Sequence, residues 1–142
     1  FSKAWGLAGL RLGATLASPP IIQVLNSIKP PYNINEVTQQ LALQAMNRLE
    51  EVNTMIRETI EERVSLQSQL AAISFVQTIF PSDANFLLVR MPDATGIYNQ
   101  LKEQGIIVRN RSNVVLCDDC LRITVGTPDE NKKLITALQS LA

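Results

Sequence analysis

Residues 120–130 read Cys-Leu-Arg-Ile-Thr-Val-Gly-Thr-Pro-Asp-Glu, and this stretch decides the fold class. Apolar and polar side chains alternate over residues 120–125, which predicts a strand with one buried face. A helix is expected over residues 128–141, because its first turn holds a proline and two acidic residues. A strand that leads directly into a helix indicates a fold that mixes α and β structure.

The rest of the C-terminal half continues this mixture. Three more strands are expected, over residues 75–80, 86–91 and 106–108. Residues 94–104 are typical of a helix, with Gly105 as its C-terminal cap. Strands mixed with helices that cover a small sheet give the α+β fold class.

The N-terminal half is expected to be mostly helical. A short buried strand is predicted over residues 10–17, and a helix over residues 18–28 that the following prolines stop. Asn35 is the predicted cap of a longer helical region, which reaches residue 72 as two helices or one bent helix. Apolar residues recur in this region at three- and four-residue steps, which predicts a face packed on the strands, with a coiled coil as the alternative. The members of this apolar stripe are Leu41, Ala45, Leu49, Val52, Ile56, Ile60, Val64, Leu70 and Ile73.

The composition narrows the classes of function. The chain has 142 residues, enough for one domain with a real core, and its 13 basic residues balance its 13 acidic residues. No basic block marks a nucleic-acid interface, and no apolar run approaches the roughly 18 residues of a membrane span. Because the sequence contains no histidine, a histidine-based triad or a histidine-containing zinc site is excluded within this chain.

Cys117 and Cys120 form a Cys-Asp-Asp-Cys pair. A redox pair is expected at the N-terminus of a helix, whereas this pair precedes a predicted strand. A structural zinc site needs two more ligands at suitable spacing, and the sequence does not offer them. Two reduced thiols are therefore expected, with a redox or metal role as the alternative.

Residues 1–13 read Phe-Ser-Lys-Ala-Trp-Gly-Leu-Ala-Gly-Leu-Arg-Leu-Gly and carry the strongest chemical signal. The amine of Lys3 is able to condense with an aldehyde, and Ser2 and Arg11 are able to donate hydrogen bonds to a phosphate. This combination suits pyridoxal phosphate, which carries both groups. The alternative is an ordinary solvated lysine near a chain end.

Four stretches of the chain form one pattern when their order and spacing are considered. They are residues 2–13, residues 29–35 (Lys-Pro-Pro-Tyr-Asn-Ile-Asn), residues 105–109 (Gly-Ile-Ile-Val-Arg) and residues 120–127. In this order and at these distances they resemble the C-terminal part of the histidinol-phosphate aminotransferase family, a branch of the fold-type I aminotransferases. The resemblance implies that residues 1–30 are a remnant of the large, cofactor-binding domain. It implies that residues 31–142 form the small C-terminal domain, and that the part upstream of the lysine is missing.

The resemblance also implies roles for the first residues of the chain. Lys3 is similar to the lysine that binds pyridoxal 5'-phosphate covalently and, once freed, moves a proton during catalysis. Ser2 and Arg11 are similar to the residues that bind the cofactor phosphate, one through a hydroxyl group and the other through a guanidinium group.

The same resemblance assigns substrate contacts further along the chain. Arg122 is similar to the residue that binds the substrate anion, which is the phosphate of histidinol phosphate or the carboxylate of glutamate. An exposed strand arginine is the alternative for this position. Tyr32 and Asn33 are expected near the mouth of the active site, or else in a plain turn. Arg109 and Arg111 are expected to be exposed surface charges, with a loop that approaches the substrate as the alternative.

The implied activity is that of a pyridoxal-phosphate-dependent transaminase in histidine biosynthesis. It transfers an amino group reversibly from glutamate to imidazole-acetol phosphate, giving 2-oxoglutarate and histidinol phosphate. The resemblance implies a cytoplasmic homodimer with small-molecule substrates and with no nucleic-acid or membrane partner. The isolated chain is expected to be inactive, to bind the cofactor weakly or not at all, and to self-associate. A non-enzymatic self-associating module and an aminotransferase for aromatic or other amino acids are the alternatives.

Overall fold

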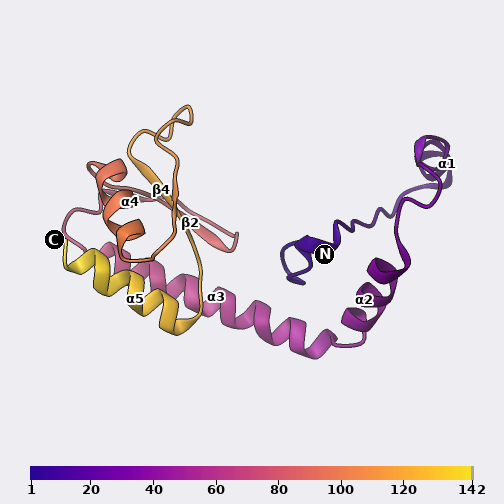
Figure 1. Cartoon of the computed structure of the whole chain (residues 1–142), viewed down its shortest axis with the longest axis horizontal. Coiled ribbons are helices and arrows are strands. Elements are labelled where there is room, and N and C mark those ends of the chain that lie inside the picture. The colour runs from indigo at the N-terminus through magenta and orange to yellow at the C-terminus, as the bar shows by residue number, and fades with distance from the viewer. Residues whose placement is uncertain (142) are drawn as a thin grey trace. The chain divides into compact units, whose positions relative to one another are not determined.

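The computed structural model describes residues 1–141, which divide into two compact units (Figure 1). The first unit is Phe1–Ile56, and the second unit begins at Arg57. The division falls inside helix α3, Leu49–Ala71, so this helix contributes residues to both units. The domain boundary expected near residue 30 concerns a complete aminotransferase and stays a prediction.

The first unit is mostly helical, and two of its helices begin where the sequence predicted. A short 3-10 helix, η1, spans Ala8–Leu10, and α1 spans Pro19–Ile28, opening with two prolines whose fixed φ suits a first turn. α2 spans Glu36–Met46. The side chain of Asn35 accepts a hydrogen bond from the backbone N–H of Thr38 at 2.8 Å. This bond satisfies one of the unpaired N-terminal donors of α2 and confirms Asn35 as its cap.

The strand predicted over residues 10–17 does not form. Residues 12–18 have no regular secondary structure, and the side chain of Leu16 is 98% exposed. A strand needs a neighbouring strand to complete its backbone hydrogen bonds, and the described residues of the first unit include no other strand. An apolar run without such a partner remains an extended, solvated segment.

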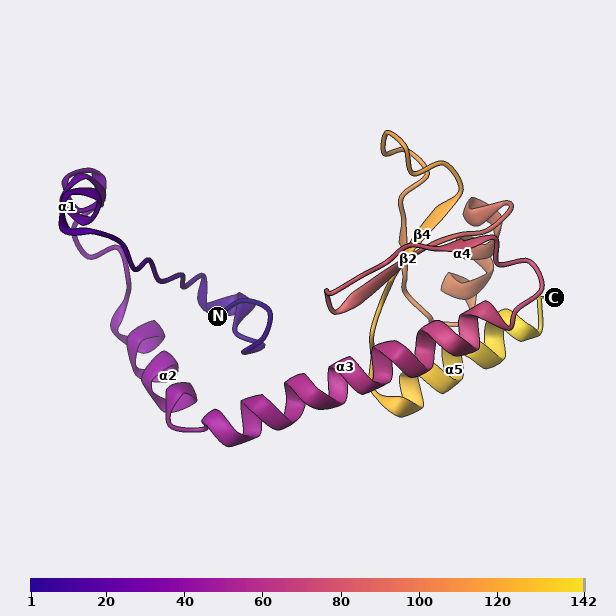
Figure 2. The same cartoon turned by 180° about the vertical axis from the view of Figure 1, so that it is seen from behind.

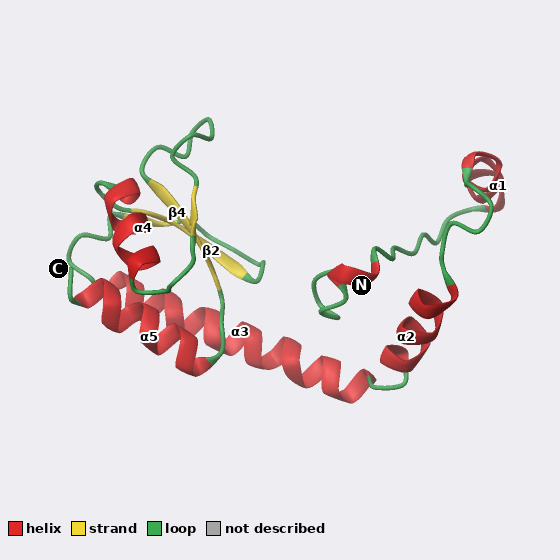
Figure 3. Ribbon diagram, viewed as in Figure 1, coloured by secondary structure: helices red, strands yellow, loops and turns green. Residues whose placement is uncertain are grey.

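Between residues 57 and 141, the second unit contains a four-stranded antiparallel sheet in the order β1-β2-β4-β3 (Figure 3). The strands are β1 Thr78–Ile79, β2 Phe86–Arg90, β3 Arg109–Asn110 and β4 Cys120–Thr124. β2 and β4 confirm two of the predicted strands. β1 is shorter than predicted, and β3 lies just after the predicted stretch 106–108. Both are edge strands. Their ends depend on the few residues that form hydrogen bonds with β2 (for β1) or with β4 (for β3), and not on how apolar the sequence is.

Two helices of the second unit have strong local signals at their ends. α4 spans Ala94–Glu103 and is followed by Gly105 at φ +76°, a conformation that glycine adopts at little cost. α5 spans Pro128–Gln139 and begins with a capping box, in which Thr127 N–H donates to Glu130 Oε2 at 2.8 Å. Hydrogen bonds from Thr127 lower the pKa of Glu130. Both helices therefore confirm the predictions to within two residues.

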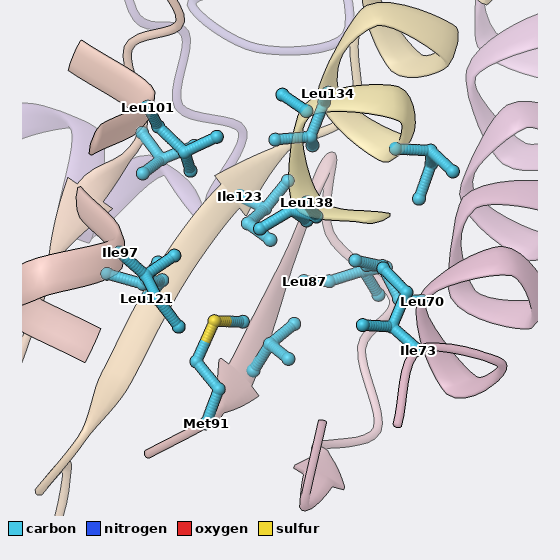
Figure 4. Packing of buried hydrophobic residues seen from close by; sticks show 14 of the residues in the cluster. Leu70, Ile73, Leu87, Met91, Ile97, Leu101, Leu121, Ile123, Leu134 and Leu138 are labelled. Atoms are coloured by element: carbon cyan, nitrogen blue, oxygen red, sulfur yellow. The ribbon is translucent and has the colours of Figure 1, made fainter. Parts of the chain in front are cut away.

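One face of the sheet carries the core (Figure 4). Leu87 and Val89 of β2 lie opposite Ile123 and Leu121 of β4, and all four side chains are buried. They belong to one cluster with side chains from α3, α4 and α5. The helical members of this cluster are Leu66, Leu70, Ala94, Ile97, Leu101, Leu134, Ile135, Ala137 and Leu138. Alternate residues of β2 and β4 therefore point away from the core, onto the other face of the sheet.

The predicted apolar stripe is buried only at its C-terminal end. Leu70 and Ile73 are in the core, whereas Leu41, Ile60 and Val64 are exposed. The C-terminal part of α3 lies alongside α5, as Figures 1 and 2 illustrate. The prediction of a core-facing stripe is therefore right for the C-terminal part of α3, which packs in the core, and wrong for the exposed residues before it.

Candidate functional site

Residues 1–11 fold into a series of tight turns that carry the predicted cofactor residues. The backbone N–H of Gly6 donates to the carbonyl of Lys3 at 3.0 Å, and that of Leu7 donates to the carbonyl of Phe1 at 3.2 Å. Gly6 adopts a φ of +64°, which side-chain-bearing residues rarely adopt. These turns leave Lys3 exposed and Ser2 half-buried.

Arg11 ends this series of turns in a left-handed conformation, with a φ of 52°. Its Nη1 atom donates to the carbonyl of Ala8 at 3.2 Å. A guanidinium group has five N–H donors, so this contact leaves donors for a phosphate. An amine, a hydroxyl group and a guanidinium group therefore share one short segment. This donor set fits pyridoxal phosphate, which needs an amine for its aldehyde and hydrogen-bond donors for its phosphate.

Tyr32 and Asn33 lie in the turn that connects α1 to α2. Tyr32 is 99% exposed and has a φ of 55°, and Asn33 is also exposed. A non-glycine residue with positive φ is uncommon and is often found at functional turns. The geometry keeps both side chains available to a ligand, and their substrate role stays a prediction.

Arg122 lies in the second unit, on the face of the sheet opposite the core. Its register partners are Leu88 in β2 and Arg109 in β3. The guanidinium carbon lies 5.0 Å from the centre of the Phe86 ring, which is within the range of a cation–π interaction. The ring fixes the guanidinium group against the sheet, so the charge is held in place before any ligand arrives.

Arg122 has an unpaired hydrogen-bond donor within the part of the chain that the structure describes. Its Nε atom is buried and has no hydrogen-bond acceptor among the residues that the structure describes. Burial, together with the charges of Arg109 and Arg111, lowers the pKa of Arg122. A buried, unpaired donor beside two like charges is suited to an anion, because an anion would supply the missing acceptor and relieve the repulsion.

Arg109 and Arg111 are residues for which the sequence favoured a surface position over an approach to the substrate. They were expected to be surface charges, and Arg109 is indeed exposed, but Arg111 is half-buried. Arg109 pairs with Arg122, and the backbone N–H of Arg111 donates to the carbonyl of Cys120 at 2.8 Å. The pairing of β3 with β4 therefore brings these three residues together as an arginine cluster. The Arg-Asn-Arg alternation at the end of a predicted strand was the signal for it.

Ser112 adds a second unpaired donor next to the cluster in sequence. Its hydroxyl oxygen is buried and has no partner among residues 1–141. The backbone N–H of Ser112 donates to Asn110 Oδ1 at 2.9 Å, and Asn110 Nδ2 donates to Thr95 Oγ1 at 2.9 Å. The turn that carries Ser112 is thus tied to α4. Its hydroxyl group is a further unpaired donor at this end of the sheet.

Lys3 in the first unit and Arg122 of the arginine cluster in the second are features that the resemblance to aminotransferases predicted. Residues 1–138 match the family described as aminotransferase class I and II, and the chain belongs to this family. The chain is 51% identical to a histidinol-phosphate aminotransferase from Flavobacterium psychrophilum, over 99% of this chain and 40% of that enzyme. The resemblance found in the sequence is therefore confirmed. The chain spans about 40% of the length of the curated relatives that it matches.

Solved structures support the same assignment of fold. The histidinol-phosphate aminotransferase from Sinorhizobium meliloti, in complex with pyridoxal-5'-phosphate, superimposes with a TM-score of 0.81 at 28% identity, over 100% of this chain and 40% of that one. An L-threonine-O-3-phosphate decarboxylase from Porphyromonas gingivalis superimposes with a TM-score of 0.85 at 26% identity, over 99% and 44% of the two chains. The predicted α+β small-domain fold of fold-type I enzymes is confirmed by these similarities.

Two further observations concern membranes and metals. Across residues 1–141, no helix combines the length and the apolar character needed to cross a bilayer. The same residues do not bring three or more metal-binding side chains of the His, Cys, Asp or Glu type into one group.

Proposed function

We propose that the whole protein is a pyridoxal-phosphate-dependent aminotransferase that converts imidazole-acetol phosphate into histidinol phosphate, with glutamate as the amino donor. The observation that carries this proposal is the 51% identity with a histidinol-phosphate aminotransferase along nearly the entire chain. The arginine cluster supports it, because both substrates are anions that need a fixed cationic site.

The first unit supplies the residues for the cofactor. Pyridoxal phosphate, when bound, stabilises the carbanion that forms when the substrate Cα loses its proton. Lys3 would hold the cofactor through its aldehyde, and the Nζ of Lys3 would accept the Cα proton of the substrate and return it. Ser2 and Arg11 donate hydrogen bonds to the cofactor phosphate.

The second unit supplies the residues for the substrate anion. The planar guanidinium group of Arg122 suits two oxygens of a phosphate or a carboxylate, so one residue serves both half-reactions. Arg109 and Arg111 raise the local positive potential, which favours the doubly charged phosphate over a neutral side chain. Tyr32 and Asn33, on the exposed turn between α1 and α2, contact the substrate near the mouth of the site.

The architecture of the complete enzyme is part of the proposal. Residues 1–30 belong to the large cofactor-binding domain, and residues 31–142 form the small domain. The enzyme is a homodimer, and it works in the cytoplasm on small-molecule substrates. The exposed apolar side chains of α1 and α2, among them Ile28 and Leu43, support this arrangement because such residues are usually covered in an assembled protein.

The test uses the complete enzyme with pyridoxal phosphate bound. Arg122→Ala is expected to raise KM for histidinol phosphate and for glutamate by more than about tenfold, because losing one partner of a desolvated charge pair costs about 2–5 kcal/mol. The absorbance of the bound cofactor is expected to stay unchanged. Arg48→Ala is the matched control, since Arg48 is an exposed arginine paired with Glu51 on the surface.

Lys3→Ala tests the other half of the site. It is expected to abolish turnover while the enzyme still captures the cofactor slowly and without a covalent bond. Unchanged KM values in Arg122→Ala would remove that residue from the substrate site. Turnover of aromatic amino acids but not of histidinol phosphate would favour an aminotransferase of different specificity, and a complete protein without cofactor or turnover would favour a non-enzymatic module.

A further inference from the structure

The Cys-Asp-Asp-Cys sequence folds into a tight turn directly before β4. The backbone N–H of Cys120 donates to the carbonyl of Cys117 at 3.1 Å. Asp119, the third residue of the turn, has a left-handed φ of 52°. A turn closed by this hydrogen bond keeps its first and fourth Cα atoms within about 7 Å of each other. Disulfide-bonded cysteines have Cα atoms about 4.4–6.8 Å apart, so the backbone already holds the two cysteines near bonding range.

The two thiols differ in their access to solvent. Both cysteines are free, Cys117 is half-buried, and Cys120 is fully buried. The Sγ atom of Cys120 donates to the carbonyl of Asp118 at 3.4 Å, inside the same turn. A small reagent therefore reacts with Cys117 first, and Cys120 lies three residues further along the chain. This is the arrangement of an attacking thiol and a resolving thiol.

The turn is fastened to the sheet by contacts that do not involve sulfur. Arg90 Nε donates to the carbonyl of Asp118 at 3.2 Å, and the backbone N–H of Met91 donates to the carbonyl of Asp119 at 3.0 Å. The guanidinium group of Arg90 also lies 5.5 Å from the centre of the Phe80 ring, which keeps it in position. Closing a bond between the cysteines therefore requires little rearrangement of the backbone.

We propose that Cys117 and Cys120 form a dithiol site that reacts with low-molecular-weight disulfides, such as glutathione disulfide, and closes to an intramolecular disulfide. The thiolate of Cys117 attacks one sulfur of the reagent, which gives a mixed disulfide and releases one molecule of glutathione. Cys120, after losing its proton, attacks the Cys117 sulfur and releases the second molecule of glutathione. The protein loses two protons and two electrons, and glutathione disulfide takes them up to become two thiols. The site is independent of the aminotransferase activity.

The experiment treats the 142-residue chain with glutathione disulfide and follows its intact mass. The expected product is a monomer that is lighter by two hydrogen atoms and returns to its original mass with dithiothreitol. Cys120→Ser is expected to stop at one glutathione adduct on Cys117, because the resolving thiol is missing. Cys117→Ser is expected to lose most of the reactivity, because the remaining thiol is buried.

Three results would overturn the proposal. In the first, the wild-type chain carries two glutathione adducts. In the second, it forms only disulfides between two copies of the chain. In the third, the folded chain remains unmodified although a denatured sample reacts. Cys120→Ala provides a second variant in case serine is not tolerated at this buried position, and far-UV circular dichroism identifies the variant that folds. A folded Cys120→Ala chain that still loses two hydrogen atoms without dimerising would also contradict the assignment.

Discussion

Replacing Arg122 by methionine is expected to stabilise the ligand-free chain and to remove its response to phosphate. The reason is the unpaired Nε donor, since a buried donor without an acceptor costs about 1–3 kcal/mol. The contact with Phe86 offsets about 0.5–1 kcal/mol of this cost. Because the remainder of the side chain is half-exposed, the net gain on replacement is about 1 kcal/mol, which corresponds to about 4–8 °C in Tm for a domain of this size.

The measurement is thermal unfolding in dilute buffer, with and without inorganic phosphate. Phosphate rather than pH is the informative variable. The folded-state pKa of Arg122 is lowered, so its charge opposes folding at every pH below that pKa. An arginine titrates only near pH 12 or above, so this contribution is constant across the working range. Phosphate at about 100 times its Kd is expected to stabilise the wild-type chain by about 2.7 kcal/mol and to leave Arg122→Met unchanged.

Arg48→Met is the matched control for this prediction. Arg48 is exposed and paired with Glu51, so its replacement is expected to leave the phosphate response of the wild-type chain intact. The reasoning fails if Arg122→Met melts below the wild-type chain without phosphate, or if it keeps the phosphate response.

Two further predictions concern the junction between β4 and α5. Asn131→Ala is expected to lower the free energy of unfolding, measured in urea titrations, by about 1–3 kcal/mol. The reason is that the buried amide of Asn131 donates to Glu62 at 2.8 Å and accepts from Gly126 N–H at 3.0 Å. An unchanged urea midpoint would contradict this prediction. The lowered pKa of Glu130 predicts stability that is complete above the ordinary glutamate value of about 4.3 and is lost as the pH falls through the lower folded-state value. Acid titrations of wild-type and Glu130→Gln chains measure this difference, and identical acid profiles would refute the assignment.

Helix ends were predictable from the sequence because their signals are local. Asn35 and Thr127 bond to backbone groups three residues away, and Gly105 needs no partner to adopt its left-handed φ. The predictions of the Asn35 cap, of the Gly105 cap and of the helix that follows Thr127 depended on a few neighbouring residues, and the structure confirms them.

Features that depend on pairing between distant segments were not predictable in the same way. The strand expected over residues 10–17 had the right composition, but its formation requires a partner strand. Arg109 and Arg111 were expected to be surface charges, because the Arg-Asn-Arg alternation does not show which strand β3 pairs with. The role of Arg122 could be inferred from the resemblance to aminotransferases, whereas its unpaired Nε and its like-charged neighbours became visible only in the folded sheet.

The alternation of side chains along β4 separates two kinds of evolutionary constraint. Leu121 and Ile123 are part of the hydrophobic core, and a change in the volume of either side chain disturbs the packing of the entire core. Arg122 lies between them in the chain but on the other face, where its replacement leaves that packing untouched. The charge offered to a ligand can therefore vary among descendants of this protein without loss of the fold. A scaffold of this kind is suited to acquiring new substrates one residue at a time.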